Sequence, residues 1–134
     1  IADPWPRVSG IAKVDLLLKK STNPNDDDET NVVAKFMYPP NCYGGEPMFV
    51  PRISSVDSCT DHGGGAEDDG YVLVFMHNEV TGRSELLVLD ASSSGGPSME
   101  LLASIKLPSR VPYGFHGTFI TKDELKHQKD RLSN

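Results

Sequence analysis

The chain has 134 residues, and its 37% hydrophobic residues together with 12 glycines make about 46%, which is the composition of one ordinary globular domain and excludes a disordered tail. Its formal net charge of −6, with 13 scattered Lys and Arg residues, argues against a nucleic-acid partner, because phosphate binding requires a basic stripe. No stretch approaches the roughly 20 apolar residues that cross a bilayer. Because the chain begins at Ile1 without an initiator Met, we expect a truncated or processed piece whose targeting signal lay upstream.

Short apolar runs separated by turn residues predict a series of β-strands. In chain order, these runs cover residues 8–18, 32–38, 47–51, 71–77, 85–89, 101–107 and 117–120. Thr81-Gly82 predicts a hairpin, and the SSSGGP segment at 92–97 predicts another connection. The pattern is typical of an all-β sandwich, barrel or propeller. About seven short strands would make only one to two propeller blades, which favours a fragment of a larger fold.

Polar segments mark the longer connections. Residues 21–31 and 54–65 are polar and longer than typical loops, so they predict insertions at the surface. The acidic segment 67–70 (EDDG) does not have the spacing of a calcium-binding loop. It is interpreted as a turn before the next strand, with Gly70 supplying backbone freedom.

One helix is expected near the C-terminus. Thr121, followed three residues later by Glu124, forms a capping box. Leu125 and the polar residues up to Arg131 then predict a short tail helix.

The two cysteines, Cys42 and Cys59, both lie in sequence that is typical of loops. Two cysteines in a chain of this length do not make a disulfide framework. Free thiols are favoured, and a bridge between them stays open as an alternative.

His116 is the strongest candidate metal ligand. It lies in the segment 111–118 (VPYGFHGT), where Pro112 stiffens the approach and the neighbouring glycines permit close backbone contact. An imidazole flanked by small residues at the start of a strand suits a ligand that faces inward. No second ligand lies at local spacing, so any co-ligands would come from elsewhere, and a buried structural histidine stays the alternative.

The other three histidines have plainer interpretations. His62 lies among glycines and is expected to be solvated. His77 ends a predicted strand and would cap a hairpin. His127 is expected to be exposed on the tail helix.

Glu46 is a second candidate site residue. It stands between two glycines and Pro47 at the entrance to the strand 47–51, where we expect it to be partly buried. Its carboxylate could accept a hydrogen bond from a metal-bound imidazole and so orient the ring. The alternative is a turn with a solvent-facing carboxylate. The chain contains no phosphate-binding loop, HExxH, CxxC pair or GxSxG motif.

Four segments together resemble the plant carotenoid cleavage dioxygenases. They are DPWPRVSGIAKVDL (3–16), YGGEPMFVPR (43–52), EDDGYVLVFMHNE (67–79) and IKLPSRVPYGFHGTF (105–119). They occur in the family's order and span nearly the whole chain. Within this family the segments are most similar to the C-terminal part of a 9-cis-epoxycarotenoid dioxygenase. The last segment is highly specific, and the first favours the branch that cleaves epoxycarotenoids.

The resemblance implies an all-β fold. Residues 1–134 would be the C-terminal part, about one to two blades, of a single seven-bladed β-propeller domain, followed by a short C-terminal helix. It implies a non-haem Fe(II) bound by four histidines. His116 matches the last of these ligands, Glu46 matches the glutamate that hydrogen-bonds a ligating histidine from another blade, and Phe115 would help to wall the substrate tunnel. The other three ligands would lie upstream of Ile1, and no residue of this chain is assigned a catalytic role.

For the complete protein, the resemblance implies oxidative cleavage of a carotenoid double bond with O₂ as co-substrate. The expected reaction converts a 9-cis-epoxycarotenoid to xanthoxin, on the route to abscisic acid, in a plastid. Membrane contact would be peripheral and made only by regions missing from this chain. The alternatives are another regiospecificity, such as 9,10 cleavage, and a non-catalytic truncated piece of a propeller. The fragment alone is expected to be inactive.

Overall fold

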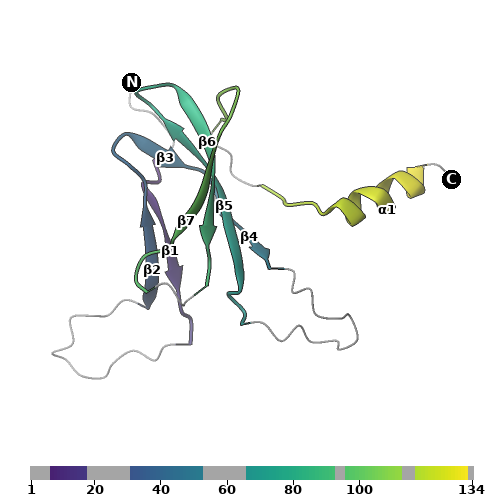
Figure 1. The fold of residues 1–134 in the computed structure, drawn as a ribbon, viewed down its shortest axis with the longest axis horizontal. Helices are drawn as coiled ribbons and strands as arrows, with labels where there is room; N and C mark the ends of the chain where they lie inside the picture. Colours follow the sequence, from purple (N-terminus) through teal and green to yellow (C-terminus); the bar gives the residue numbers. More distant parts are fainter. Residues whose placement is uncertain (1–6, 18–30, 53–65, 93–95, 113–116, 133–134) are drawn as a thin grey trace.

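The computed structural model describes residues 7–17, 31–52, 66–92, 96–112 and 117–132 (Figure 1). Within these ranges the chain is mostly β-sheet with one short helix, as the sequence predicts. The elements are β1 (Gly10–Val14), β2 (Val32–Met37), β3 (Cys42–Gly44), β4 (Met48–Pro51), β5 (Gly70–Asn78), β6 (Arg83–Asp90), β7 (Leu101–Lys106) and α1 (Lys122–Leu132).

Five strands form one antiparallel sheet in which β5 is the longest member. The strand β6 pairs with β5 on one side and with β7 on the other. On the free side of β5, β3 and β4 follow one another: β3 pairs with the last part of β5, and β4 pairs with its first part. The two therefore act as one edge strand that is interrupted at residues 45–47. Pro47 contributes to the interruption because it has no N–H to donate to a ladder.

The strands β1 and β2 form a second, two-stranded sheet that lies beside the first (Figure 1). It is tied to the larger sheet by backbone bonds at both ends. Gly44 N donates to Val8 O at 3.0 Å, and Lys35 N donates to Pro97 O at 2.9 Å. Each tie joins a segment of one sheet to a segment beside the other, so the two sheets share one core.

The core lies between the two sheets. Alternate residues of β5 and β6 point toward β1 and β2, and the most deeply buried are Val74, Leu87 and Leu89, at 2%, 2% and 0% exposed. Ile11 and Phe36 of the small sheet pack against them. Burying side chains of this size contributes roughly 1.5–3 kcal/mol each. The opposite residues of β5, at odd positions from 71 to 77, face away from this core.

Three predictions about the strands differ from the structure. The first strand ends at Val14, because Asp15 Oδ1 accepts Leu17 N at 2.8 Å and turns the chain; Leu17 is 87% exposed. Residues 117–120 form no strand, and Gly117 N donates to a side chain instead of a neighbouring strand. The interrupted edge strand β3 falls in sequence that predicted a loop.

Gly70 is also needed for a different reason than predicted. The turn before β5 is present, with Asp69 N donating to Ala66 O at 2.8 Å. Gly70 itself already belongs to β5, and it is not among the residues with positive φ. A Cβ there would lie 2.5 Å from Val50 O and 2.6 Å from the Phe49 ring. A close approach of β4, and not backbone freedom, therefore requires the glycine.

The predicted capping box begins α1. Thr121 N donates to Glu124 Oε2 at 2.8 Å, and Glu124 N donates in return to Thr121 Oγ1 at 3.2 Å. These bonds hold the pKa of the Glu124 carboxyl below its usual value. The described side chains of the helix are exposed, and it extends away from both sheets (Figure 1).

Cys42 is a buried free thiol in β3, 3% exposed, and not a loop residue. It belongs to the core between the sheets, together with Tyr38 and Met76. The predicted free state is confirmed for Cys42. Cys59, His62 and nearly all of the loops predicted at 21–31 and 54–65 lie outside the described residues.

Tyr38 offers a test of how this core is packed. Its hydroxyl is buried and has no hydrogen-bond partner among the residues that the structure describes, and an unsatisfied buried polar group costs about 1–3 kcal/mol. We therefore expect Tyr38→Phe to raise the free energy of unfolding by about 1 kcal/mol. Chemical denaturation of both proteins measures this difference, and a loss of stability in the variant would contradict it.

The same variant should change the alkaline stability. Burial raises the pKa of Tyr38 from 10.0 to about 12. Between these values the unfolded chain releases the proton while the folded chain keeps it, so the stability of the wild type falls as the pH rises through this window. Below pH 10 the contribution is fully present. Tyr38→Phe should remove this part of the loss of stability at alkaline pH. If the free energy of unfolding of the variant falls with pH as steeply as that of the wild type, the loss does not come from Tyr38.

Candidate functional site

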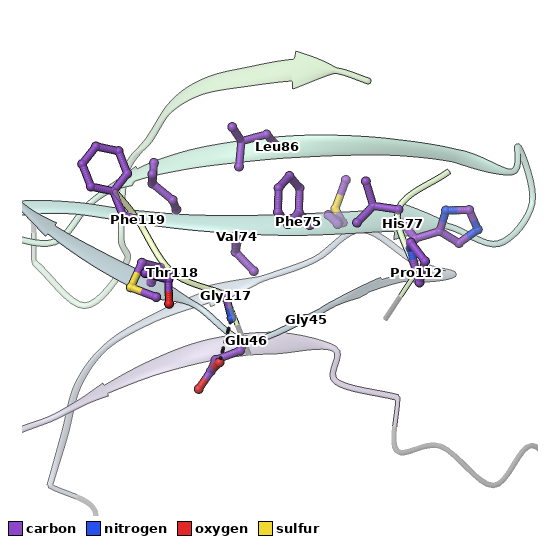
Figure 2. A pocket seen from close by; sticks show the side chains of 14 residues that line it. Gly45, Glu46, Val74, Phe75, His77, Leu86, Pro112, Gly117, Thr118 and Phe119 are labelled. Carbon is purple, nitrogen blue, oxygen red and sulfur yellow. Dashed lines mark hydrogen bonds between the residues drawn. The ribbon is translucent and has the colours of Figure 1, made fainter. Parts of the chain in front are cut away.

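A hollow of about 440 Å³ lies on the face of the large sheet that points away from the core. Its floor is β5 and β6, one wall is the break between β3 and β4, and its roof is formed by segments on either side of residues 113–116 (Figure 2). Its lining residues are Gly45, Glu46, Met48, Leu73, Val74, Phe75, Met76, His77, Leu86, Val111, Pro112, Gly117, Thr118 and Phe119. An apolar concavity with a few polar groups is typical of small-molecule sites.

The two ends of the segment that carries His116 meet at this hollow. Pro112 precedes the segment and Gly117 follows it, and both residues line the cavity (Figure 2). His116 and Phe115 themselves lie outside the described residues. The structure thus brings the flanks of the predicted metal-ligand motif together with the second predicted site residue, Glu46.

Glu46 lies at the break in the edge strand. Gly45 N donates to Phe75 O at 3.0 Å and so keeps the break attached to β5. There the Glu46 carboxylate lies beside Gly117, and its Oε2 accepts a hydrogen bond from Gly117 N at 3.3 Å (Figure 2). Glu46 is exposed and not partly buried as predicted, because the interruption turns it toward the open side of the sheet. Glu46 therefore contacts Gly117, the residue that directly follows His116 in the sequence.

His77 was expected to cap a hairpin, and the structure assigns it a more specific place. It is 5% exposed, lies within β5 and lines the hollow. Its Nδ1 lies 3.0 Å from the hydroxyl of Ser84, its cross-strand partner on β6. The same hydroxyl accepts Val111 N at 3.0 Å. The hairpin predicted at Thr81-Gly82 would have placed His77 opposite Ser84 on the neighbouring strand. No motif in the sequence, however, indicates a role for Ser84.

A buried serine beside an imidazole invites comparison with a hydrolytic dyad. Ser84 is 1% exposed, and its oxygen already accepts the Val111 amide. A nucleophile must reach its substrate, and this hydroxyl is enclosed by the fold. The pair is therefore a structural contact and not a nucleophilic site.

The described residues do not form a metal site by themselves. No group of three or more His, Cys, Asp or Glu side chains in the described ranges could hold a metal ion. Glu46 and His77 are the ionisable side chains among the described residues that line the hollow. A metal at this place would therefore need ligands from residues beyond those described.

Two aspartates of the acidic segment 67–70 form ion pairs. Asp68 pairs with Lys13 of β1, and Asp69 Oδ1 accepts Arg52 Nε at 2.9 Å. The hydrogen bond from Asp69 raises the pKa of Arg52 above its usual value. Arg52 also lies 3.6 Å from Asp90, whose pKa is lowered chiefly by the backbone N–H of Ser92. These contacts stabilise the end of the sheet that lies away from His77. They agree with the predicted turn before β5.

This arrangement defines an antiparallel β-sheet protein with an apolar cavity on one face. Residues 1–121 match the family model described as retinal pigment epithelial membrane protein. The chain belongs to this family, which includes the carotenoid cleavage dioxygenases, and the resemblance noted from its motifs is confirmed.

Several curated plant proteins are similar to almost the whole chain. A probable carotenoid cleavage dioxygenase 4, chloroplastic, of Arabidopsis thaliana is 45% identical over 125 residues, which are 93% of this chain and 18% of that protein. A chloroplastic 9-cis-epoxycarotenoid dioxygenase of the same plant is 43% identical, covering 96% of this chain and 18% of that protein. A chromoplastic zeaxanthin 7,8(7′,8′)-cleavage dioxygenase of Crocus sativus is also 43% identical, covering 96% of this chain and 31% of that protein.

A solved structure agrees with these relatives. A variant of the Synechocystis apocarotenoid oxygenase superposes with a TM-score of 0.57 at 32% sequence identity, covering 84% of this chain and 19% of that chain. The chain thus spans roughly a fifth to a third of the length of the relatives that it matches. In the described residues, no helix has the length and apolar character needed to cross a membrane.

Proposed function

We propose that this chain is the C-terminal part of a non-haem iron dioxygenase that cleaves a carotenoid double bond oxidatively. The observation that carries the proposal is the convergence of three matched motifs on one apolar hollow: the flanks of 113–116, the break that holds Glu46, and β5. The membership of the chain in the family supports the same activity. In this proposal residues 1–134 belong to a single β-propeller domain and supply about one to two of its seven blades.

In this proposal His116 is one of four histidine ligands of Fe(II), and the other three come from outside this chain. The iron would supply the activation of O₂. Glu46 would hydrogen-bond the ring of a ligating histidine and hold its orientation. Phe115 would wall the passage for the substrate. Apolar residues of the hollow, including Leu73, Phe75 and Phe119, suit a polyene and would help to exclude water.

The proposed substrate is a 9-cis-epoxycarotenoid, cleaved to xanthoxin, in a plastid. A relative named for this activity is 43% identical, and relatives named chloroplastic or chromoplastic support the location. A second candidate function, cleavage at another bond, is favoured by the equal identity of the zeaxanthin 7,8(7′,8′)-cleavage enzyme. Any contact with a membrane surface would be peripheral and made by regions outside this chain.

A product assay on the complete protein tests the activity and separates these substrates. The purified protein, loaded with Fe(II) in the presence of O₂, is offered a 9-cis-epoxycarotenoid, zeaxanthin and a 9,10-cleavable carotenoid. We expect xanthoxin from the first, identified by chromatography and mass spectrometry. Products of 7,8 or 9,10 cleavage would replace the proposed regiospecificity with the corresponding alternative, and no cleavage product from any carotenoid would refute the activity.

Iron analysis of the isolated 134-residue chain tests the assignment of the ligands. One histidine should not retain Fe(II), because the affinity of such a site depends on its complete ligand set. We expect less than stoichiometric iron after desalting. Tight 1:1 iron would contradict the proposal that three further ligands lie elsewhere.

A further inference from the structure

Two hydrogen bonds attach the segment 111–117 to the large sheet, one at each end. At its start, Val111 N donates to Ser84 Oγ at 3.0 Å. At its end, Gly117 N donates to Glu46 Oε2 at 3.3 Å. His116 lies in the sequence between these two anchors. The anchors therefore bound the stretch of chain that the proposed function places at the metal.

The first anchor consists of two buried side chains in contact, Ser84 and His77. Ser84 is 1% exposed and His77 is 5% exposed, and Ser84 Oγ lies 3.0 Å from His77 Nδ1. A serine oxygen can accept one hydrogen bond while donating another. The oxygen accepts the Val111 amide and lies within hydrogen-bonding distance of His77 Nδ1, and the direction of this second bond depends on which ring nitrogen of His77 carries the proton. The contact with the imidazole holds the Ser84 oxygen in place beside the Val111 amide.

Both anchors depend on the same short part of β5. His77 is the cross-strand partner of Ser84 on β6 and of Tyr43 on β3. The break that carries Glu46 is bonded to Phe75, two positions earlier, through Gly45 N. A strand advances roughly 3.3 Å per residue, so the two attachment points on β5 are about 7 Å apart. β5 is paired on both sides, which makes this spacing rigid.

We propose that His77 and Ser84 are positioning residues that fix Val111, where the chain enters the segment that carries His116, at the wall of the hollow. Together with Glu46 they hold both ends of the segment at a spacing set by β5. The consequence for iron rests on the proposed function, in which His116 is a ligand. The anchoring itself does not depend on the metal, because all three hydrogen-bond contacts are present in the protein alone.

The test compares Ser84→Ala with a matched substitution, Ser104→Ala, in the complete protein. Ser104 lies on β7, and its hydroxyl donates to the carboxylate of the half-buried Glu85; neither residue lines the hollow. Hydrogen exchange at the Val111 amide is measured on the metal-free protein, and the dissociation constant of Fe(II) and the thermal midpoint are measured in parallel. Ser84→Thr keeps the hydroxyl and serves as the rescue variant. If Ser84→Ala does not fold, Ser84→Cys replaces it, because a thiol is only a weak donor.

We expect Ser84→Ala to accelerate exchange at Val111 and to weaken Fe(II) binding, each by about tenfold, which is the loss of a typical hydrogen bond. Ser104→Ala should leave the exchange at Val111 and the Fe(II) affinity unchanged. Ser84→Thr should keep both close to their wild-type values. If Ser84→Ala lowers the thermal midpoint but leaves Val111 exchange and iron affinity unchanged, the pair is only part of the core and the proposal is overturned.

The outcome for the parent proposal is read separately. If His116→Ala leaves iron binding intact, the proposed function fails, and exchange at Val111 alone still decides whether the pair anchors the segment. If His116→Ala abolishes iron binding and Ser84→Ala leaves both readouts at the wild-type value, the positioning role fails while the proposed function stands.

Discussion

Replacing His116 with alanine in the complete protein is expected to abolish stoichiometric iron and carotenoid cleavage. In the proposed site, His116 supplies one of four imidazoles. Loss of a partner that only orients a metal ligand already weakens metal binding by roughly 10- to 100-fold, and loss of the ligand itself should cost at least about 100-fold. Iron content after desalting, measured by elemental analysis, and product formation are the two readouts.

The control is a second histidine that lies far from the hollow. His127 is exposed on α1, which extends away from the sheets (Figure 1). His127→Ala is the same chemical change and should leave iron content and cleavage at the wild-type level. Retention of full iron and activity by His116→Ala would remove His116 from the metal site. Loss of both by His127→Ala would instead indicate that histidine replacement disturbs the protein generally.

Two substitutions of Glu46 should have different effects. Glu46→Gln keeps an oxygen that can accept Gly117 N but removes the negative charge. If the carboxylate braces a metal-bound imidazole, Fe(II) affinity should fall by roughly 10- to 100-fold, while hydrogen exchange at Gly117 stays close to that of the wild type. Glu46→Ala removes both functions, so it should weaken iron binding and also accelerate exchange at Gly117. Metal titration and exchange measurements together separate the two roles.

Glu100→Gln is the matched control for charge. Glu100 is exposed and precedes β7, outside the lining of the hollow. Its substitution makes the same change in net charge as Glu46→Gln and should leave iron affinity unaltered. An unchanged iron affinity in Glu46→Gln would reduce Glu46 to an anchor for Gly117 at the break of the edge strand. Equal losses in both variants would attribute the effect to net charge.

Several elements could be predicted because their causes are local. The cross-strand alternation of β5 and β6 is written in runs such as YVLVFMH and ELLVL, and Gly82 allows the positive φ of 66° that the hairpin between them uses. The capping box at Thr121 likewise depends on residues only three positions apart. Each of these signals needs no distant partner, which is why the sequence was sufficient.

Errors occurred where a distant partner decides the conformation. β3 becomes a strand because the exposed edge of β5 accepts it, although its own residues are typical of a loop. Residues 117–120 have strand-forming side chains, but the Glu46 carboxylate takes the Gly117 amide. Glu46 is exposed because the edge strand breaks there. In the first two cases the deciding hydrogen bond comes from a segment far away in the sequence.

The sequence by itself determined the β-rich class, the capped tail helix, the family of the protein, and Glu46 and His116 as the residues to test. Only the tertiary structure showed that Glu46 and the flanks of 113–116 share one apolar hollow, and that the buried pair of His77 and Ser84 holds the start of that segment. The physical reason is that motifs depend on neighbouring residues. A cavity and its hydrogen bonds depend instead on which strands pair and which faces they bury.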